Sequence, residues 1–432
     1  MSLAPVSGVN IVGAGLAGSL LAIVLAKRGY QVTVYERRTD PRIGTADSGR
    51  SINLALAARG IRGLKLAGAL ERVMPITIPM RGRMVHEHDG AAALQMYGVR
   101  PEEVIYSVSR TALNRALIEE AAAQPNVSLH FGQLCLGLAH DRDVLEFREE
   151  ATGRIHHCAA QPTIATDGGG SAVRDSLVAR EVAVVREDPL DHDYKELTIP
   201  ARDGKHVMDP HALHIWPRGG FMLIALPNLD ATFTATLFLA RSGANSFERL
   251  RNAGDVEAFF AREFPSARAL MPDLAREWFE HPQGSLGTVY TRGWHLDGRV
   301  LLLGDAAHAI VPFHGQGMNC AFEDCAELLR MMDEHHSWSG LFEAFEQERR
   351  PNTDAIARMA LENYLEMREA VLDPEYRKKK KQAEELEKTD PGFIPRYSKV
   401  MFHPEISYLE ALGTPAAISR SPETAGRKSG SR

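Results

Sequence analysis

A glycine-rich turn near the start of the chain restricts its fold more than any other segment. Gly13-Ala14-Gly15-Leu16-Ala17-Gly18 fits the pattern GxGxxG and stands between the apolar run Val9–Val12 and a helical stretch that ends near Arg28. An alternating strand, Gln31–Glu36, follows, so the pattern predicts two parallel strands with a helix packed across them. In such a unit the first glycine makes the tight turn, the second lets a pyrophosphate approach the helix N-terminus, and the third lets helix and strand pack closely.

A carboxylate at the end of the second strand gives this turn a more specific meaning. Glu36 lies 23 residues after Gly13, where an acidic side chain can accept hydrogen bonds from the two hydroxyls of a ribose. Arg37 and Arg38 follow directly and favour the ribose in the adenosine half of FAD. The alternative is a plain βαβ turn with a glutamate on the surface.

A second motif indicates where the rest of such a cofactor would lie. Val300–His308 reads VLLLGDAAH, and Gly315-Gln316-Gly317-Met318-Asn319 follows shortly after it. We expect Asp305 to accept a hydrogen bond from a ribityl chain, and a helix that begins near Met318 to direct its N-terminus toward the isoalloxazine and pyrophosphate. A strand, a turn and a helix with Asp305 as a simple cap is the alternative.

A third segment, Ala165–Arg174, reads ATDGGGSAVR and places Asp167 in a turn before a helix. Together the three segments resemble the group A flavoprotein aromatic monooxygenases, with their GxGxxG, DG and GD motifs. That family more often has Gly-Ala or Gly-Cys where this chain has Ala165-Thr166. We interpret this departure as a change in packing.

The resemblance implies an α/β fold with a Rossmann-like FAD-binding domain, an inserted, mostly antiparallel β-sheet domain for the substrate, and a C-terminal helical region. Aromatic and β-branched residues between about Pro189 and Pro282 agree with the inserted sheet. The pattern also predicts a helix over about Leu54–Ala69. The expected boundaries are 1–75, 100–180 and 295–345 for the FAD-binding domain, 76–99 and 181–294 for the substrate domain, 346–412 for the helical region, and 413–432 for a disordered tail.

Longer segments resemble the branch of this family that hydroxylates L-kynurenine, over about residues 9–411. They are Gly49–Leu56, Met80–His86, Leu213–Pro217, Ala225–Asn228, Val311–Asn319, Glu362–Tyr364 and Phe393–Ser398. By this resemblance Arg83 and Tyr97 bind the amino-acid carboxylate of the substrate, and Asn363 and Tyr397 complete the polar end. A guanidinium offers a carboxylate a bidentate fork, and a phenol adds one more hydrogen bond.

Motifs and resemblance together supply two sets of candidate contacts. The aromatic ring of the substrate would be enclosed by Leu213, Met222, Ile224, Leu226, Phe238, Pro312, Phe313, His314 and Met367. FAD would lie against Gly13, Gly15, Ala17, Gly18, Tyr35, Glu36, Arg37, Arg38, Ala55, Arg110, Cys135, Asp167, Asp305, Gly317, Met318 and Asn319. From the residues alone, Arg83 is equally a structural arginine, and each apolar wall residue is equally part of a core.

The implied reaction belongs to tryptophan catabolism and uses NADPH and O2. Reduced flavin and O2 form a C4a-hydroperoxide, whose distal oxygen passes to the ring of L-kynurenine to give 3-hydroxy-L-kynurenine. Because the aniline nitrogen already activates the ortho carbon, we expect no catalytic base, and we interpret His308 as structural. With no second GxGxxG segment evident, NADPH is expected to dock transiently on the same domain.

Two alternative functions stay open at this point. The first is the same chemistry on a modified kynurenine or another aminoaromatic acid. The second is a non-catalytic FAD-binding protein that never turns over NADPH. Metal-ligand spacing, a nucleophile elbow and a Walker A pattern are absent from the sequence, so we expect no metal site.

The composition excludes several other classes of protein. The formal charge of -6, from 50 basic and 56 acidic residues, creates no global field for nucleic acid or an anionic membrane. Four cysteines without a CxxC pair indicate a reducing, cytoplasmic compartment. The uncharged stretch Ile11–Ala26 is shorter than the roughly 20 residues that a spanning helix needs. We therefore expect a soluble protein whose partner is a small-molecule substrate.

Overall fold

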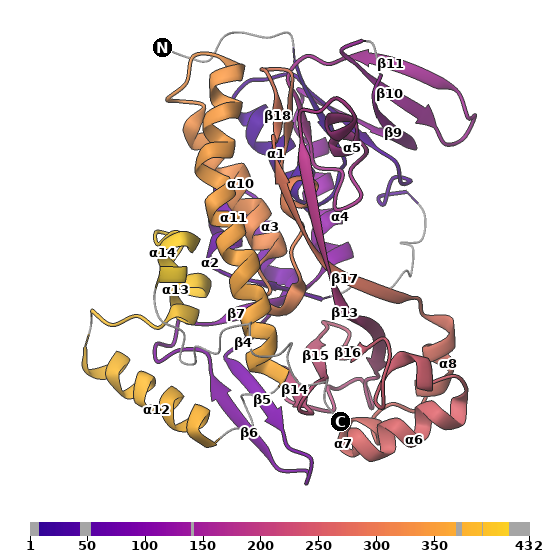
Figure 1. Ribbon diagram of the computed structural model, residues 1–432, viewed down its shortest axis with the longest axis vertical. Coiled ribbons are helices and arrows are strands. Elements are labelled where there is room, and N and C mark those ends of the chain that lie inside the picture. The colour runs from indigo at the N-terminus through magenta and orange to yellow at the C-terminus, as the bar shows by residue number, and fades with distance from the viewer. Residues whose placement is uncertain (1–7, 44–52, 140–141, 369–373, 391, 414–432) are drawn as a thin grey trace, which may run out of the picture.

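The computed structural model describes residues 8–43, 53–139, 142–368, 374–390 and 392–413. In Figure 1 the long helix α11 runs beside a layered α/β region, and a second sheet with its own helices lies at the opposite end. The first sheet has the strand order β18-β19-β12-β1-β2-β8, with parallel neighbours except for the antiparallel pair β18 and β19. Its strands are β1 (Val9–Val12), β2 (Val32–Glu36), β8 (Val127–Phe131), β12 (Thr163–Ala165), β18 (His295–Leu296) and β19 (Val300–Leu302).

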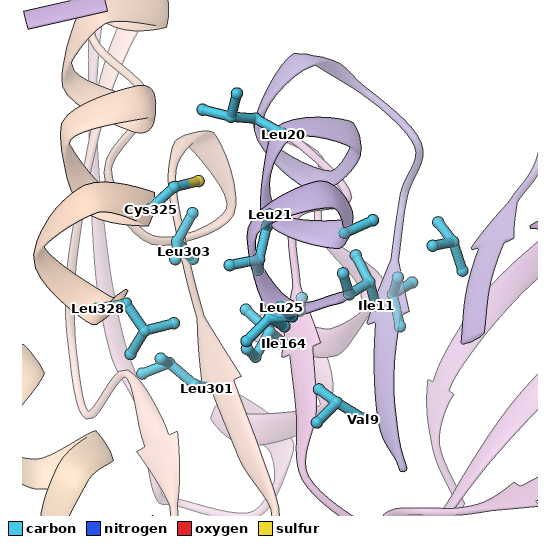
Figure 2. Close-up of a cluster of buried hydrophobic side chains, with 14 of the residues drawn as sticks. Val9, Ile11, Leu20, Leu21, Leu25, Ile164, Leu301, Leu303, Cys325 and Leu328 are labelled. Carbon is cyan, nitrogen blue, oxygen red and sulfur yellow. The ribbon is translucent and has the colours of Figure 1, made fainter. Parts of the chain in front are cut away.

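Helices α1 (Leu16–Lys27), α4 (Arg110–Ala122) and α10 (Gly317–Met331) pack beside this sheet. Strand β1 (VNIV) is buried at all of its positions, which explains why three of its residues are apolar. Its one polar side chain, Asn10, donates a hydrogen bond to the carbonyl of Ala159 at 3.1 Å. Figure 2 shows the core that results, where side chains of α1 and α10 meet those of the strands. The labelled members are all buried and comprise Val9, Ile11, Leu20, Leu21, Leu25, Ile164, Leu301, Leu303, Cys325 and Leu328.

The second large sheet has the strand order β17-β13-β16-β15-β14-β5-β6 and is antiparallel except where β14 pairs with β5. This arrangement confirms the expected antiparallel sheet within the α/β fold. Its outer face packs against α6 (Ala253–Glu263), α7 (Pro265–Arg268) and α8 (Leu274–Glu280). The strands are β5 (Gly82–His86), β6 (Ala92–Met96), β13 (Val184–Ile199), β14 (Ala212–Pro217), β15 (Met222–Pro227), β16 (Phe233–Ala240) and β17 (Gln283–Arg292).

Two three-stranded sheets complete the strands. One contains β3 (Asn53–Leu56), β7 (Ile105–Ser109) and β4 (Thr77–Met80); the other contains β9 (Gln133–Leu138), β10 (Val144–Glu149) and β11 (Ile155–Ala159). The predicted helix over about Leu54–Ala69 was wrong at its start, because β3 precedes α2 (Ala58–Ala67). The backbone of β3 pairs with β7 along its whole length, and this tertiary pairing overrides local helix propensity.

The C-terminal part of the chain is helical, as expected. Helix α11 (Trp338–Arg368) is followed by α12 (Pro374–Thr389), α13 (Arg396–Phe402) and α14 (Tyr408–Gly413). The remaining short elements are α3 (Leu70–Val73), η1 (Met74–Ile76), α5 (Ala172–Ala179), η2 (Phe247–Arg249), α9 (Asp305–His308) and η3 (Pro312–His314). The expected disordered tail, beyond its first residue, and residues 49–52 of the resemblance lie outside the described residues. Among the helices that are described, none is both long and apolar enough to cross a membrane.

Candidate active site and cofactor cavity

One continuous cavity of about 810 Å³ lies between the two large sheets. Its lining differs at its two ends. The end that we call the glycine end is formed at the carboxyl edge of the six-stranded sheet, by Gly13, Gly15, Glu36, Asp167 and Asp305 among others. The end that we call the aromatic end is formed on the seven-stranded sheet and the C-terminal helices, by Arg83, Tyr97, Phe238, Phe313 and Tyr397 among others.

The period of the strands explains how the aromatic end is built. Met222, Ile224 and Leu226 occupy alternate positions of β15 and line the cavity. Leu223 and Ala225, between them, belong to the core on the opposite face of the sheet. Since successive side chains of a strand point to opposite faces, one strand serves the cavity and the outer core at once.

Arg83 is the one basic side chain that the sequence predicted for the aromatic end, and it is 7% exposed. Its guanidinium carbon lies 4.9 Å from the ring centre of Tyr397 and 5.7 Å from that of Tyr97. Burial raises the pKa of both tyrosines, and Arg83 opposes that rise. Among the described residues, the buried hydroxyl of Tyr97 has no well-aligned hydrogen-bond partner, and Arg83 is the basic group that acts on it. A buried cation beside a phenol in this state forms a site for an anionic group of a ligand.

His314 lies in the same wall and stacks on Tyr397, with ring centres 5.4 Å apart. Burial, together with the nearby positive charge of Arg83, lowers the pKa of His314 to about 3. The imidazole is therefore neutral near pH 7. It adds a polar but uncharged edge to a wall that consists mainly of rings and aliphatic chains.

All the apolar side chains predicted to enclose an aromatic ring line the cavity, whereas Asn363 does not. The Asn363 amide donates to the carbonyl of Phe313 at 2.6 Å. The ring of Phe313 stacks on Tyr364 with a centre-to-centre distance of 3.8 Å. Asn363 thus supports the wall from behind, and its direct contact with a substrate stays a prediction.

At the glycine end the backbone of the first turn has the shape that its glycines suggest. Gly13 has a φ of +97°, and a Cβ on Gly18 would lie 1.9 Å from the carbonyl oxygen of Gly13. A Cβ on Gly15 would meet nothing within 4 Å, so this position opens into the cavity. The turn therefore exposes bare backbone to the cavity at Gly15. Gly18, in the first turn of α1, lies outside the lining and lets the helix pack tightly against Gly13.

Glu36 lines the cavity at the end of β2 and is 5% exposed. Its Oε2 accepts a hydrogen bond from the backbone N–H of Ala14 at 2.7 Å, and its Oε1 accepts from the N–H and Nε of Arg38 at 2.9 and 2.7 Å. Burial alone would raise the pKa of Glu36, but these hydrogen bonds hold it below its usual value. The carboxylate is therefore ionised and fixes the glycine turn at the entrance to α1.

Asp167 is the second acid at this end. Burial raises its pKa, and its buried Oδ1 has no hydrogen-bond partner among the residues that the structure describes. The preceding residue, Thr166, donates its hydroxyl to the carbonyls of Val12 and Gly13 at 3.0 and 2.9 Å. The unusual threonine before Asp-Gly thus joins two strand ends, as expected of a packing change.

Most other residues predicted for the cofactor also line the cavity. They are Ala17, Tyr35, Arg37, Arg38, Ala55, Arg110, Cys135, Asp305, Gly317 and Met318. Asn319 does not line it. Its Oδ1 accepts from the N–H of Ala57 at 2.9 Å, and its Nδ2 donates to the carbonyls of Ala55 and Gly315 at 2.8 and 2.7 Å. Asn319 therefore holds two lining loops together, and its direct contact with a cofactor stays a prediction.

Several lining residues escaped the sequence analysis, and Tyr194 is the largest of them. It lies on β13, where it pairs across the sheet with Gly284. A Cβ on Gly284 would come within 2.3 Å of the Tyr194 ring, so the glycine makes room for the phenol. The mixed polar sequence of β13 conceals the strand. The other lining residues that were missed include Gln133, Thr166, Thr234, Thr236, Ser285 and Met401.

Comparisons with known proteins agree with this geometry. A family model described as FAD binding domain matches residues 7–360. A kynurenine 3-monooxygenase of Xanthomonas oryzae pv. oryzae (strain MAFF 311018) is 49% identical over 404 residues, which cover 93% of this chain and 89% of the relative. The chain belongs to the kynurenine 3-monooxygenase family.

Two further likenesses concern the family and the fold, respectively. A second protein of the same name, from Stenotrophomonas maltophilia (strain K279a), is 48% identical over 407 residues, which cover 93% of this chain and 89% of the relative. The crystal structure of p-nitrophenol 4-monooxygenase from Pseudomonas putida DLL-E4 has a TM-score of 0.72 at 19% identity and covers 95% of this chain and 99% of that one. At that identity the second likeness shows the fold alone.

The kynurenine 3-monooxygenase family uses FAD, and the residues at the glycine end fit it. The open position at Gly15 admits a pyrophosphate against bare backbone. The Asp167 Oδ1 without a partner is a buried acceptor that a bound hydroxyl or N–H would satisfy. The 15-residue helix α10 begins at Gly317, which also lines the cavity, so its positive end faces the same space.

Proposed function

We propose that this protein uses FAD to hydroxylate L-kynurenine on its aromatic ring. NADPH supplies two electrons, one oxygen atom of O2 enters the ring to give 3-hydroxy-L-kynurenine, and the other leaves as water with the formation of NADP⁺. FAD, when bound at the glycine end, supplies the redox chemistry that activates O2. The relatives at 48 to 49% identity carry the name of this activity.

The observation that carries the proposal is the buried Arg83 between two phenols at the aromatic end of a cavity whose other end fits FAD. L-Kynurenine combines an amino-acid carboxylate with an aromatic ring, and these are the two groups that this end can receive. The guanidinium of Arg83 would bind the carboxylate as a fork, and the Tyr97 hydroxyl would add a hydrogen bond. The apolar wall would then hold the ring between the strands and Phe313.

The chain contributes placement and exclusion of water to this reaction. The lining of the aromatic end is mostly apolar and buried, so it keeps water from the reacting ring. His314 stays neutral because of its burial, and we assign no proton transfer to it. The aniline nitrogen of kynurenine activates the ring by itself, so correct orientation is the main requirement on the protein.

The test is NADPH oxidation by the purified flavoprotein with and without L-kynurenine, with separation and identification of the products. Strong stimulation with 3-hydroxy-L-kynurenine as the main product supports the proposal. Stimulation that yields mainly hydrogen peroxide would identify kynurenine as a poorly oriented analogue of another aminoaromatic acid. No stimulation by kynurenine would overturn the assignment.

We also propose that the enzyme acts in the cytoplasm. All four cysteines are free thiols, and the sequence provides no disulfide framework that an oxidising compartment would favour. Cell fractionation with an antibody against the native protein tests this location.

A further inference from the structure

The two last described helices pack against each other and against the rest of the fold: α13 against α2, and α14 against α11. In Figure 1 they lie beside the lower part of α11 and close to α2. Helix α13 contributes Tyr397 and Met401 to the cavity. Helix α14 contributes nothing to the cavity lining, yet its first residue, Tyr408, is fully buried. This raises the question of what the Tyr408 hydroxyl does in the interior.

The Tyr408 hydroxyl donates a hydrogen bond to Oε1 of Gln316 at 2.8 Å. The other polar atom of that amide, Nε2, lies 3.0 Å from the sulfur of Met401 on α13. Both polar atoms of the Gln316 side chain are therefore held from the C-terminal helices. Gln316 is itself fully buried.

The backbone of Gln316 begins α10. Its carbonyl accepts the hydrogen bond from the N–H of Cys320 at 2.7 Å, in the first turn of that helix. Its chain neighbours Gly315 and Gly317 line the cavity, as does His314. Gln316 thus stands between the C-terminal helices and the loop that joins the aromatic end to the glycine end.

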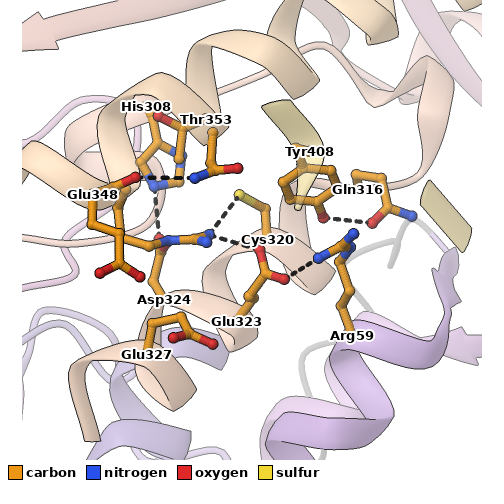
Figure 3. A network of polar contacts seen from close by, with 12 residues as sticks. Arg59, His308, Gln316, Cys320, Glu323, Asp324, Glu327, Glu348, Thr353 and Tyr408 are labelled. Carbon is orange, nitrogen blue, oxygen red and sulfur yellow. Dashed lines mark hydrogen bonds and ion pairs between the residues drawn. The ribbon is translucent and has the colours of Figure 1, made fainter. Parts of the chain in front are cut away.

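A buried ionic network fixes Tyr408 in place. The guanidinium carbon of Arg59, on α2, lies 4.0 Å from the centre of the Tyr408 ring. Arg59 also forms an ion pair with Glu323 of α10 and donates to the carbonyl of Ile406 just before α14. Figure 3 shows Arg59, Tyr408 and Gln316 together, with dashed lines from Tyr408 to Gln316 and from Arg59 to Glu323.

The network continues to the Gly-Asp motif. Arg349 pairs with Glu323 at 2.9 Å and with Asp324 at 2.8 Å, and Oδ2 of Asp324 accepts a hydrogen bond from Nε2 of His308 at 2.7 Å. His308, Cys320 and Asp324 could form a metal site by distance alone. However, Arg349 already contacts Asp324 and lies 3.8 Å from the sulfur of Cys320. The acids Glu323 and Asp324 and the arginines Arg59 and Arg349 balance in formal charge. The cluster therefore joins α2, α10 and α11 by ion pairs.

We infer that Tyr408 is a positioning residue for the hydroxylation. This role rests on the proposed function. Its hydrogen bond to Gln316 holds the 314–317 loop in register only while α13 and α14 are docked. Docking of the helix that brings Tyr397 to the aromatic end is thereby coupled to the start of α10 at the glycine end. The substrate wall and the cofactor helix are set by one contact.

The decisive variant is Tyr408→Phe, which keeps the ring over Arg59 and removes only the hydroxyl. With L-kynurenine present, we expect the share of NADPH electrons released as hydrogen peroxide to rise at least threefold, at unchanged flavin content. Loss of folded protein alone cannot produce this result, because unfolded molecules oxidise no NADPH and leave the ratio of peroxide to hydroxylated product unchanged.

Gln316→Leu removes the other partner of the same hydrogen bond and carries the test if Tyr408→Phe does not fold. Both changes break the hydrogen bond between Tyr408 and Gln316, and Gln316→Leu also loses the contact with Met401. The double variant should therefore release no more peroxide than Gln316→Leu alone. Additive effects of the two substitutions would overturn the coupling. Leu341→Ala is the control for stability, since Leu341 is a buried core residue of α11 and its loss should lower the unfolding midpoint at a wild-type peroxide share.

The outcomes also separate this inference from the proposed function. If the wild-type enzyme makes no 3-hydroxy-L-kynurenine, the proposed function fails. If the wild type hydroxylates kynurenine and Tyr408→Phe shows the wild-type peroxide share, the proposed function stands and the role of Tyr408 fails.

Discussion

The two ends of the cavity differ in what forms them: mainly backbone at the glycine end and mainly side chains at the aromatic end. At the glycine end, backbone does most of the work: an open glycine, a tight turn and a helix N-terminus meet at the edge of one sheet. At the aromatic end, side chains from β5, β15, β16, η3, α11 and α13 form the wall. Ligand binding at the glycine end should therefore depend on whether a Cβ atom fits beside the backbone. Ligand binding at the aromatic end should depend on the charge and shape of side chains.

This difference predicts different consequences of small substitutions. A single methyl group is a severe change where backbone approaches backbone, but a small one in a wall of flexible chains. Removal of one charge is a severe change where a buried cation meets an anion, but a small one on an exposed surface.

The largest effect is expected for Gly18→Ala. The added Cβ would lie 1.9 Å from the carbonyl oxygen of Gly13 and 2.5 Å from Oγ1 of Thr166, so the turn must open. We expect less than about a tenth of the wild-type flavin content in the purified protein, because the pyrophosphate site is the turn itself. Flavin absorbance relative to protein absorbance measures this.

Two other glycines provide matched controls for that prediction. Gly15→Ala places its Cβ in open cavity space, so the flavin content should fall while the thermal midpoint of the apoprotein stays near wild type. Gly220→Ala also meets no atom within 4 Å and lies outside the cavity lining; it should retain full flavin. Normal flavin content in Gly18→Ala would contradict the assignment of the glycine end.

The next effect concerns the aromatic end alone. Arg83→Met keeps a flexible, unbranched apolar stem and removes the charged guanidinium. We expect the KM for L-kynurenine to rise about 100-fold, or about 3 kcal/mol, through loss of a charged hydrogen bond to the carboxylate. Flavin content should not change. Arg81→Met is the control, because Arg81 is exposed two residues away, and an equal rise in KM for both variants would refute a specific role of Arg83.

The same contrast explains how far the sequence could predict the site. Gly13, Glu36, Asp167 and Asp305 lie in short contiguous motifs whose spacing follows from one strand, one turn and one helix. The aromatic end has no such motif, since residues as distant as Arg83 and Tyr397 meet only after the chain has folded. Their roles follow from a family resemblance and not from the periodicity of the sequence.

Where residues support the lining from behind, the sequence pattern was insufficient. Asn319 and Asn363 stand within motifs but make their hydrogen bonds to the backbone of lining loops. Tyr194 lines the cavity from β13, a strand rich in polar and charged residues that pairs with β16 and β17. Their positions depend on tertiary packing, which local spacing does not encode.

The two ends should also respond to acid in different pH ranges. Burial lowers the pKa of His314 to about 3, below its ordinary value of 6.5. The unfolded state therefore binds more protons, and the stability that His314 contributes is present above pH 6.5 and lost as the pH falls toward 3. Glu36 at the glycine end also has a lowered pKa, but from an ordinary value of 4.5, so its contribution is lost only below that pH.

We therefore expect the aromatic end to weaken first on acidification. Between pH 7 and pH 5 the linkage through His314 amounts to about 2 kcal/mol of unfolding free energy, which His314→Gln should remove from the pH dependence. Denaturant midpoints of both proteins at pH 7 and 5 measure this. Equal losses of stability in wild type and variant would show that His314 titrates normally in the folded protein.

The smallest effect is expected where a side chain touches a cavity whose ligand is held by backbone. Cys135 lines the glycine end from β9 and is 9% exposed. Cys135→Ala should change the Kd for FAD by less than about threefold, a free energy below about 0.7 kcal/mol.

The matched substitution at the aromatic end is Met222→Ala, where loss of a buried side chain from the wall should raise the KM for L-kynurenine about tenfold or more. Fluorescence titration of the apoproteins with FAD and steady-state kinetics measure the pair. If Cys135→Ala weakened FAD as strongly as Met222→Ala weakened kynurenine, binding at the glycine end would depend on side chains, and the contrast between the two ends would not hold.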